Sequence, residues 1–271
     1  MKIETRGPVA FLGFINLLFM LLLILSGSIS GVLSTVIYII AFLLPIILGF
    51  KSSADRNKDG DFLSFGGIKK AAPFVAPTIL IVMGLSFLTS VIITAATGKT
   101  NDIDLGKSLI LAILTHALAP AILEEALFRF IPLRVMKKER MIEIVLWSSV
   151  FFSLIHHSLF SMPYAFFAGA MFMIIDIYTG SIWPSVIIHF LNNALSVLFA
   201  FYGESTVFVG VALAVIIALT AVSIIYVVIK RESYREFMTK LFAGKLELKP
   251  TGEVWLLSAS MIAIAIMELF V

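Results

Sequence analysis

Several side chains that can move protons or donate hydrogen bonds occur within long apolar stretches of this sequence. They fall in three of these stretches and comprise Glu124, Glu125, Arg129, His156, His189 and Asn193. An ionisable group at the centre of a bilayer costs about 2.5–3.5 kcal/mol on insertion scales, so such groups usually face a cavity or a partner. Carboxylates and imidazoles serve as general acids and bases, and N–H donors stabilise a developing negative charge. We therefore expect these residues to form one site within a membrane protein.

The spacing of the two glutamates predicts different surroundings for them. Glu125 and Arg129 are four residues apart, which places them on one face of a helix, where an ion pair forms readily. Glu124 points about 100° away from Glu125 on the same helix. We therefore expect Glu124 to stay free for chemistry.

The stretch that contains His189 shows the same four-residue spacing. His189 and Asn193 can both direct donors at one point, whereas Asn192 is expected to point elsewhere. Two further polar groups are expected to be structural. His116 is predicted to bond a neighbouring helix, and Asp176 is predicted to reach solvent near the end of its helix.

The composition is that of a polytopic membrane protein. The chain has 271 residues, of which 60% are hydrophobic and 14% charged, and its mean hydropathy is +1.07. A soluble protein has about 25% charged and 45–50% apolar residues. The absence of cysteine excludes disulfides, thiolate zinc sites and a cysteine nucleophile. The net charge of +3 comes from basic residues in short loops, so it indicates membrane orientation and not a nucleic-acid partner.

Nine apolar blocks have the length that a helix needs to cross a membrane. They cover residues 8–26, 31–50, 73–96, 108–136, 141–160, 162–179, 183–203, 206–229 and 253–270. The first lacks a clear cleavage site and is interpreted as a retained signal anchor. The last contains Glu253 and Glu268, which leaves eight or nine transmembrane helices. The sequence thus predicts an all-α fold in which residues 1–271 form a single membrane domain.

The basic residues predict how the chain is oriented. Of the 20 lysines and arginines, 18 lie on one side of the predicted spans, and only Lys99 and Lys107 lie on the other. Because basic loops stay in the cytoplasm, the N-terminus is predicted to be cytoplasmic, in what we expect to be a prokaryotic plasma membrane. The polar segment 51–72 is predicted to be a surface loop. The segment 230–250 alternates basic and apolar residues and is expected to lie in the membrane interface as an amphipathic helix.

Helical geometry predicts that the three stretches bring their polar groups to one depth. Glu124 and His156 each lie 16 residues from Arg140, which is about 24 Å along a helix. In an antiparallel hairpin of 108–136 and 141–160 these two side chains would lie side by side. His189 lies eight residues after Ser181, which is about 12 Å from the membrane surface on the basic side. If the hairpin protrudes from that surface by roughly 10 Å, Glu124, His156 and His189 lie at the same depth. We therefore expect the site in the cytoplasmic half of the bilayer, in a cavity open to the cytoplasm.

Three motifs, in this order, resemble those of the CPBP family. They are Glu-Glu-x-x-x-Arg at 124–129, Phe-x-x-x-His at 152–156 and His-x-x-x-Asn at 189–193, and the stretch 178–184 resembles the family as well. The family comprises type II CAAX prenyl endopeptidases and bacteriocin-processing or immunity proteins. The resemblance covers 108–200, which is expected to be the catalytic core, with 1–107 and 204–271 as accessory spans.

The resemblance implies an intramembrane glutamic-type protease without a cofactor. At the matching positions, Glu124 would be the general base on a water molecule, assisted by His156. His189 and Asn193 would bind the oxyanion, and the neighbouring Glu-Arg pair would brace the site. The expected partners are membrane lipids and a peptide or protein substrate, lipidated or not. Prenylated CAAX peptides, peptide pheromones and bacteriocin precursors all suit the family.

Other interpretations stay open from the sequence alone. His157, next to His156, would be the working base if its helix were rotated. Glu124, His156 and His189 could instead bind zinc, because two histidines and a glutamate are a known catalytic ligand set. A non-proteolytic immunity or scaffold protein would use the same polar groups to bond its helices. A proton-linked carrier is disfavoured because the chain has no internal symmetry.

Overall fold

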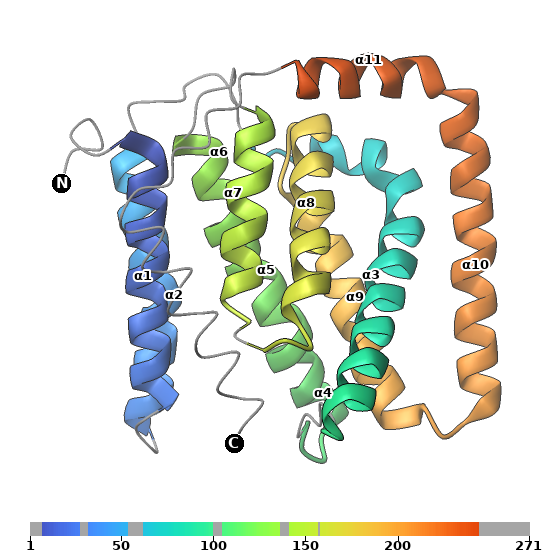
Figure 1. Cartoon of the computed structure of the whole chain (residues 1–271), viewed down its shortest axis with the longest axis horizontal. Coiled ribbons are helices and arrows are strands. Elements are labelled where there is room, and N and C mark those ends of the chain that lie inside the picture. The colour runs from blue at the N-terminus through green and yellow to red at the C-terminus, as the bar shows by residue number, and fades with distance from the viewer. Residues whose placement is uncertain are drawn as a thin grey trace.

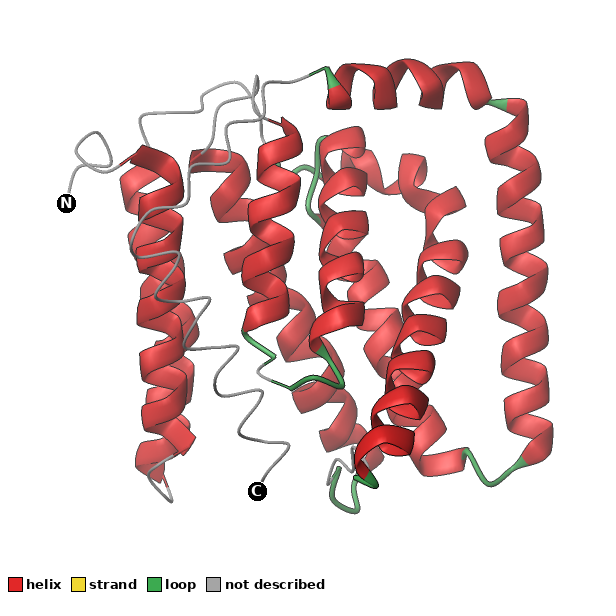
Figure 2. Ribbon diagram, in the orientation of Figure 1, coloured by secondary structure: helices red, strands yellow, loops and turns green. Residues whose placement is uncertain are grey.

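The part of the chain that the structure describes is a bundle of helices. The computed structural model describes residues 7–27, 32–53, 62–99, 105–135, 141–156 and 158–243. Within these ranges there is no strand, and short turns join the helices (Figures 1 and 2). The predicted all-α class is therefore confirmed.

Helices α1 and α2 pair with each other at one side of the bundle, and α10 stands at the other side (Figure 1). The continuous helices are α1 (Gly7–Gly27), α2 (Val32–Ser53), α3 (Ile68–Thr97), α7 (Met141–Leu154), α8 (Met162–Thr179), α9 (Trp183–Tyr202), α10 (Thr206–Ile229) and α11 (Arg231–Phe242). Helices α7 and α8 are antiparallel neighbours, α3 packs against α8 and α9, and α10 packs against α3.

The apolar helices support a protein that crosses a membrane several times. Within the described ranges, five helical segments are long and apolar enough to span a bilayer: Phe65–Thr97, Leu109–Val135, Met162–Thr179, Trp183–Tyr202 and Thr206–Ile229. Three shorter apolar helical segments cover Ala10–Ser26, Val36–Lys51 and Met141–Leu154. The predicted helical membrane protein is confirmed, while the count of eight or nine spans stays a prediction. The ninth block, 253–270, lies outside the described residues.

The helix that carries the two glutamates is interrupted twice by π-helical turns, where a single regular helix was expected. Its parts are α4 (Leu109–Ala112), η3 (Ile113–Leu118), α5 (Ala119–Glu125), η4 (Ala126–Phe130) and α6 (Ile131–Val135), with η3 and η4 being π-helical. Pro120 and Pro132 lie just after these two turns. A proline has no N–H to give to the carbonyl four residues earlier, which opens the regular hydrogen-bond pattern.

The carbonyl that Pro132 cannot bond is paired from another helix. The Ser148 hydroxyl of α7 donates a hydrogen bond to the Phe128 carbonyl oxygen. This bond ties α7 to the turn immediately after Glu125. The π-helical turn is thus held open next to the polar residues, as π-helical turns at functional sites often are.

Helix α7 ends earlier than predicted, at Leu154 and not near residue 160. Ile155 and His156 form a turn, in which the His156 N–H donates to the Ser153 carbonyl oxygen at 3.2 Å. The Ser153 hydroxyl donates to the Met162 carbonyl oxygen at 2.7 Å and thereby closes the connection to α8. His156 therefore projects from a turn, and the predicted depth that rested on a straight helix does not apply to it.

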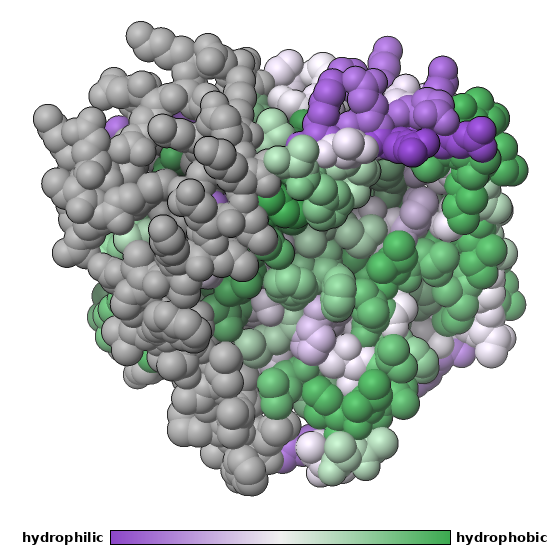
Figure 3. Space-filling model, turned by 45° about the horizontal axis from the view of Figure 1, so that its top comes forward, coloured by the Kyte–Doolittle hydropathy of each residue, from purple (hydrophilic) through white to green (hydrophobic). Residues whose placement is uncertain are grey.

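The basic residues gather at one end of the bundle, as the loop charges predicted. Lys51, Lys70, Arg134 and Lys230 lie near the same end, and α11 lies across it (Figure 1), whereas Lys99 and Lys107 belong to the connection at the opposite end. Figure 3 shows the hydrophilic surface of this end above an apolar surface.

Helix α11 packs on the end of the bundle, and its predicted place in the membrane interface stays a prediction. Leu241 is fully buried, and the Tyr234 and Phe237 rings lie 5.4 Å and 5.0 Å from the Tyr178 ring of α8. The predicted amphipathic character is present, but the apolar face covers the end of the bundle.

Single cysteines test this arrangement because the native chain has none. Lys70→Cys and Arg235→Cys are expected to react with a membrane-impermeant maleimide from one side of sealed vesicles. Glu204→Cys, in the turn between α9 and α10, is expected to react only from the other side. Labelling of the first two from opposite sides would contradict the arrangement.

Candidate active site

The catalytic residues predicted from three motifs face one cavity of about 1020 Å³. Glu124 of α5, His189 and Asn193 of α9, and His156 in the turn after α7 all line it, together with apolar residues of α3 and α8. Proteins bury such groups in a membrane only where a cavity or a partner receives them. The structure therefore brings these four residues together.

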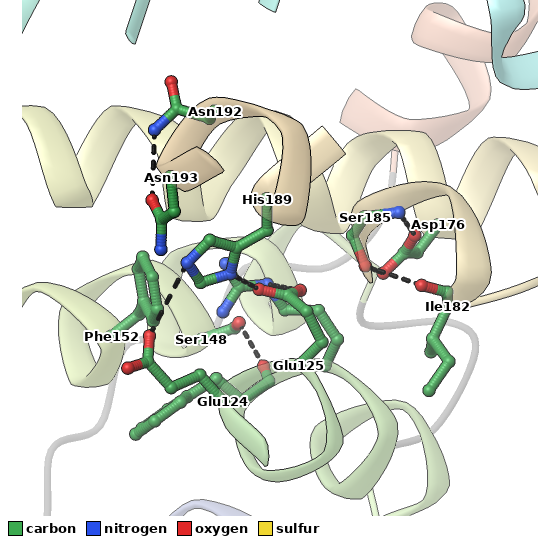
Figure 4. Close-up of polar contacts among 12 residues, drawn as sticks. Glu124, Glu125, Ser148, Phe152, Asp176, Ile182, Ser185, His189, Asn192 and Asn193 are labelled. Carbon is green, nitrogen blue, oxygen red and sulfur yellow. Dashed lines mark hydrogen bonds and ion pairs between the residues drawn. The ribbon is translucent and has the colours of Figure 1, made fainter. Parts of the chain in front are cut away.

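Three charged or polar side chains, Arg129, Glu125 and His189, form a buried chain that ends at the cavity; Figure 4 shows the contact between Glu125 and His189. Arg129 Nε lies 3.0 Å from Glu125 Oε2, and the predicted ion pair is present with both side chains fully buried. Glu125 Oε1 lies 2.8 Å from His189 Nδ1. Because a carboxylate accepts, the imidazole donates its Nδ1–H, which fixes the orientation of the ring.

The opposite edge of the His189 ring faces the second glutamate. His189 Nε2 lies 3.9 Å from Glu124 Oε2, and the Glu124 side chain is 15% exposed (Figure 4). His189 thus stands between the two glutamates. With a proton on both ring nitrogens, His189 and the Arg129 guanidinium would balance the charges of the Glu124 and Glu125 carboxylates.

His156 contributes to the same cavity from a different direction. Its Nδ1 lies 2.8 Å from the Phe152 carbonyl oxygen, and since a carbonyl only accepts, Nδ1 carries the proton. Nε2 is then the acceptor nitrogen of the neutral ring. A histidine in this tautomer can accept a proton from water, which agrees with the assisting role that the resemblance implies.

The prediction for Asn192 of α9 was wrong. Asn192 was expected to point elsewhere, yet it is buried and lines the cavity beside Asn193. Its Nδ2 donates to Asn193 Oδ1 at 3.2 Å, so the Asn193 amide nitrogen is turned toward His189 and Phe152 (Figure 4). The helical wheel missed Asn192 because the cavity extends along α9 to Ser196 and Ala200 and so exposes a broad face of that helix.

Asp176 was predicted to reach solvent, but the structure buries it. Its Oδ2 accepts from the Ser185 hydroxyl at 2.7 Å, and its Oδ1 accepts from the Ser185 N–H at 3.3 Å. Ser185 lies in the first turn of α9, where free N–H groups attract an acceptor. This contact between α8 and α9 anchors α9 one turn before His189.

The depth of the cavity also differs from the prediction. It reaches Leu105, His116 and Phe199, which lie in the half of the bundle away from the basic end. A cavity open to the basic, predicted cytoplasmic, side was expected, and the structure instead extends it toward the side that carries Lys107. His116, which was expected to bond a neighbouring helix, lines this part of the cavity.

Whether the site holds a metal stays a prediction. Glu124, His156 and His189 share the cavity, but within the described ranges no three histidine, aspartate or glutamate side chains are grouped closely enough to hold an ion. His157 lies outside the described residues, so its exchange with His156 is not decided by the structure.

Comparison with protein families matches the part of the chain that carries the site. Residues 106–195 match the family model described as Type II CAAX prenyl endopeptidase Rce1-like. The matched segment runs from the loop before α4 to α9 and includes all three motifs, which supports the predicted family. Comparisons with curated proteins and with solved structures gave no match.

The buried ion pair predicts a compensating pair of substitutions. Glu125→Gln leaves the Arg129 charge buried without its carboxylate, a change that costs about 3–5 kcal/mol when one partner of a buried pair is removed. The Tm of the detergent-solubilised protein should fall, and adding Arg129→Met should restore part of it. Glu236→Gln, which breaks an exposed pair with Lys240 at 2.7 Å, is the control and should change Tm little. A double variant less stable than Glu125→Gln alone would contradict the pairing.

Proposed function

We propose that this integral membrane protein is an intramembrane endopeptidase, because residues 106–195 match the family model described as Type II CAAX prenyl endopeptidase Rce1-like. Its substrate is a membrane-associated or lipidated peptide or protein. The observation that carries the proposal is the convergence of Glu124, His156, His189 and Asn193 on one cavity within apolar helices. A carboxylate, two imidazoles and an amide are a sufficient set for hydrolysing an amide bond.

In the proposed reaction, Glu124 is the general base. Its carboxylate takes a proton from a water molecule in the cavity while the water oxygen attacks the substrate carbonyl carbon. His156 accepts a hydrogen bond from the same water through Nε2 and so orients it. Glu124 then passes the proton to the leaving nitrogen as the C–N bond breaks, and the products are a carboxylic acid and an amine.

The negative charge on the substrate oxygen is received by two donors from α9. Asn193 Nδ2 is one donor, and the amide of Asn192 holds it in the donating orientation. His189 Nε2–H is the other, which requires the imidazolium form between Glu125 and Glu124. Donors fixed before the reaction stabilise the oxyanion without reorganising, and each is worth about 10²–10³ in rate.

We propose that the reaction needs no metal. The base, the water-orienting group and two oxyanion donors leave no chemical step for an ion to perform. The cavity is the route for water and substrate, and its extension toward Leu105 favours entry from the half of the membrane away from the basic end.

Replacing Glu124 tests the proposed base most simply. Glu124→Gln keeps the size of the side chain but cannot take a proton, so kcat on a panel of membrane-associated peptides should fall by about 10²–10⁴. The protein is assayed in liposomes, with cleavage sites read by mass spectrometry. Glu204→Gln, on the exposed turn after α9, should keep wild-type kcat. Full activity of Glu124→Gln would refute the mechanism, and a cellular phenotype that survives Glu124→Gln together with His156→Ala would favour a scaffold.

The asparagine pair yields a sharper prediction. In Asn192→Asp the new carboxylate has no N–H to give, so the Asn193 amide should turn its nitrogen toward the carboxylate and present its oxygen to the cavity. The loss of one oxyanion donor should lower kcat by about 10²–10³ and leave KM nearly unchanged, because the oxyanion exists only on the reaction path. Ser196→Ala, on the same cavity wall, is the control. A wild-type kcat for Asn192→Asp would show that Asn192 does not orient Asn193.

A further inference from the structure

The Arg129 guanidinium lies between two aromatic rings that come from different helices. Its Cζ is 4.2 Å from the centroid of the Phe152 ring of α7 and 5.4 Å from that of the Phe172 ring of α8. The side chain is fully buried, and Glu125 is its ion-pair partner. Among the described residues, no hydrogen-bond partner receives Nη1 or Nη2.

This arrangement places a cation where polar partners are few. A guanidinium carries five N–H donors, and burying donors without acceptors is costly. Aromatic faces carry negative charge density and attract a cation most strongly when water is excluded. The two rings therefore stabilise the buried Arg129 guanidinium in addition to its ion pair with Glu125.

The same two rings also touch the imidazole that faces Glu124. The Phe152 ring meets the His189 ring edge-to-face at 5.9 Å and 88°, and the Phe172 ring lies 5.5 Å from it. Both phenylalanines line the cavity. Each ring thus borders Arg129, which holds Glu125, and also His189, which Glu125 orients.

Close packing of α7 and α8 keeps the first ring in place. A Cβ at Gly169 of α8 would lie 3.0 Å from the Ser149 Cα and 3.4 Å from Cδ1 of Phe152. A side chain at this position would press on Ser149, so glycine favours the close approach of the two helices. The Phe152 ring therefore packs where α7 and α8 lie close together.

We propose that Phe152 and Phe172 form an aromatic clamp, which holds Arg129 by cation–π contact and thereby positions Glu125 and His189. The two phenylalanines are positioning residues, since they act through Arg129 and Glu125. The kinetic consequence rests on the proposed proteolytic function, while the cation–π contact itself does not.

Fluorination of one ring separates this role from simple packing. Phenylalanine with one, two or three ring fluorines, placed at position 152 by codon suppression, keeps its shape while its face loses negative charge density. Tm should fall stepwise with each fluorine. The same series at Phe151, a buried neighbour that stacks on Trp147 at 5.8 Å, should show no such trend. In an Arg129→Met background the trend at position 152 should disappear.

The second readout is kinetic. The fluorinated series at position 152 should lower kcat stepwise, on the order of tenfold in all, with a smaller effect on KM. At position 172, Phe172→Tyr should retain more activity than Phe172→Leu. Equal Tm trends at positions 151 and 152 would overturn the cation–π contact. A Tm trend without a kcat trend would overturn the positioning role. If no peptide is cleaved by the wild-type protein, the proposed function fails, and the Tm comparison still decides the contact.

Discussion

A charge pair inside an apolar helix bundle needs both members, because a single buried charge is far more costly than the pair. Arg129 and Glu125 satisfy this constraint with a 3.0 Å contact, and the second oxygen of Glu125 extends the pair to His189 at 2.8 Å. The rest of the site depends on this chain, since it fixes the edge of the imidazole that faces Glu124. Apolar packing alone would leave that ring free to rotate.

Features of the fold near the site serve to hold this chain in place. Pro132 opens the helix after Glu125, and Ser148 of α7 takes up the freed carbonyl oxygen. Asp176 of α8 secures Ser185 at the start of α9. Three contacts between helices therefore set the distances on which the chemistry depends: Ser148 to the Phe128 carbonyl oxygen, Ser185 to Asp176, and His189 to Glu125.

The sequence predicted the parts that local spacing controls. Four-residue intervals placed Arg129 with Glu125 and His189 with Asn193, and the apolar blocks predicted the membrane helices. The sequence-based predictions were wrong where contacts between distant segments decide where a helix ends or which way a side chain points. The end of α7 at Leu154, the burial of Asp176 and the inward face of Asn192 all depend on neighbouring helices. The interruptions of the helix that carries the glutamates were also missed, although Pro120 and Pro132, each just after a π-helical turn, could have indicated them.

The most direct test is an experimental structure of the Glu124→Gln variant with a peptide trapped in the cavity. The account predicts the scissile carbonyl oxygen within hydrogen-bond distance of Asn193 Nδ2 and His189 Nε2, with a water molecule between the residue at position 124 and the carbonyl carbon. A peptide whose carbonyl contacts neither donor would contradict it. A metal ion held by His156 and His189 in the wild-type protein would contradict it equally.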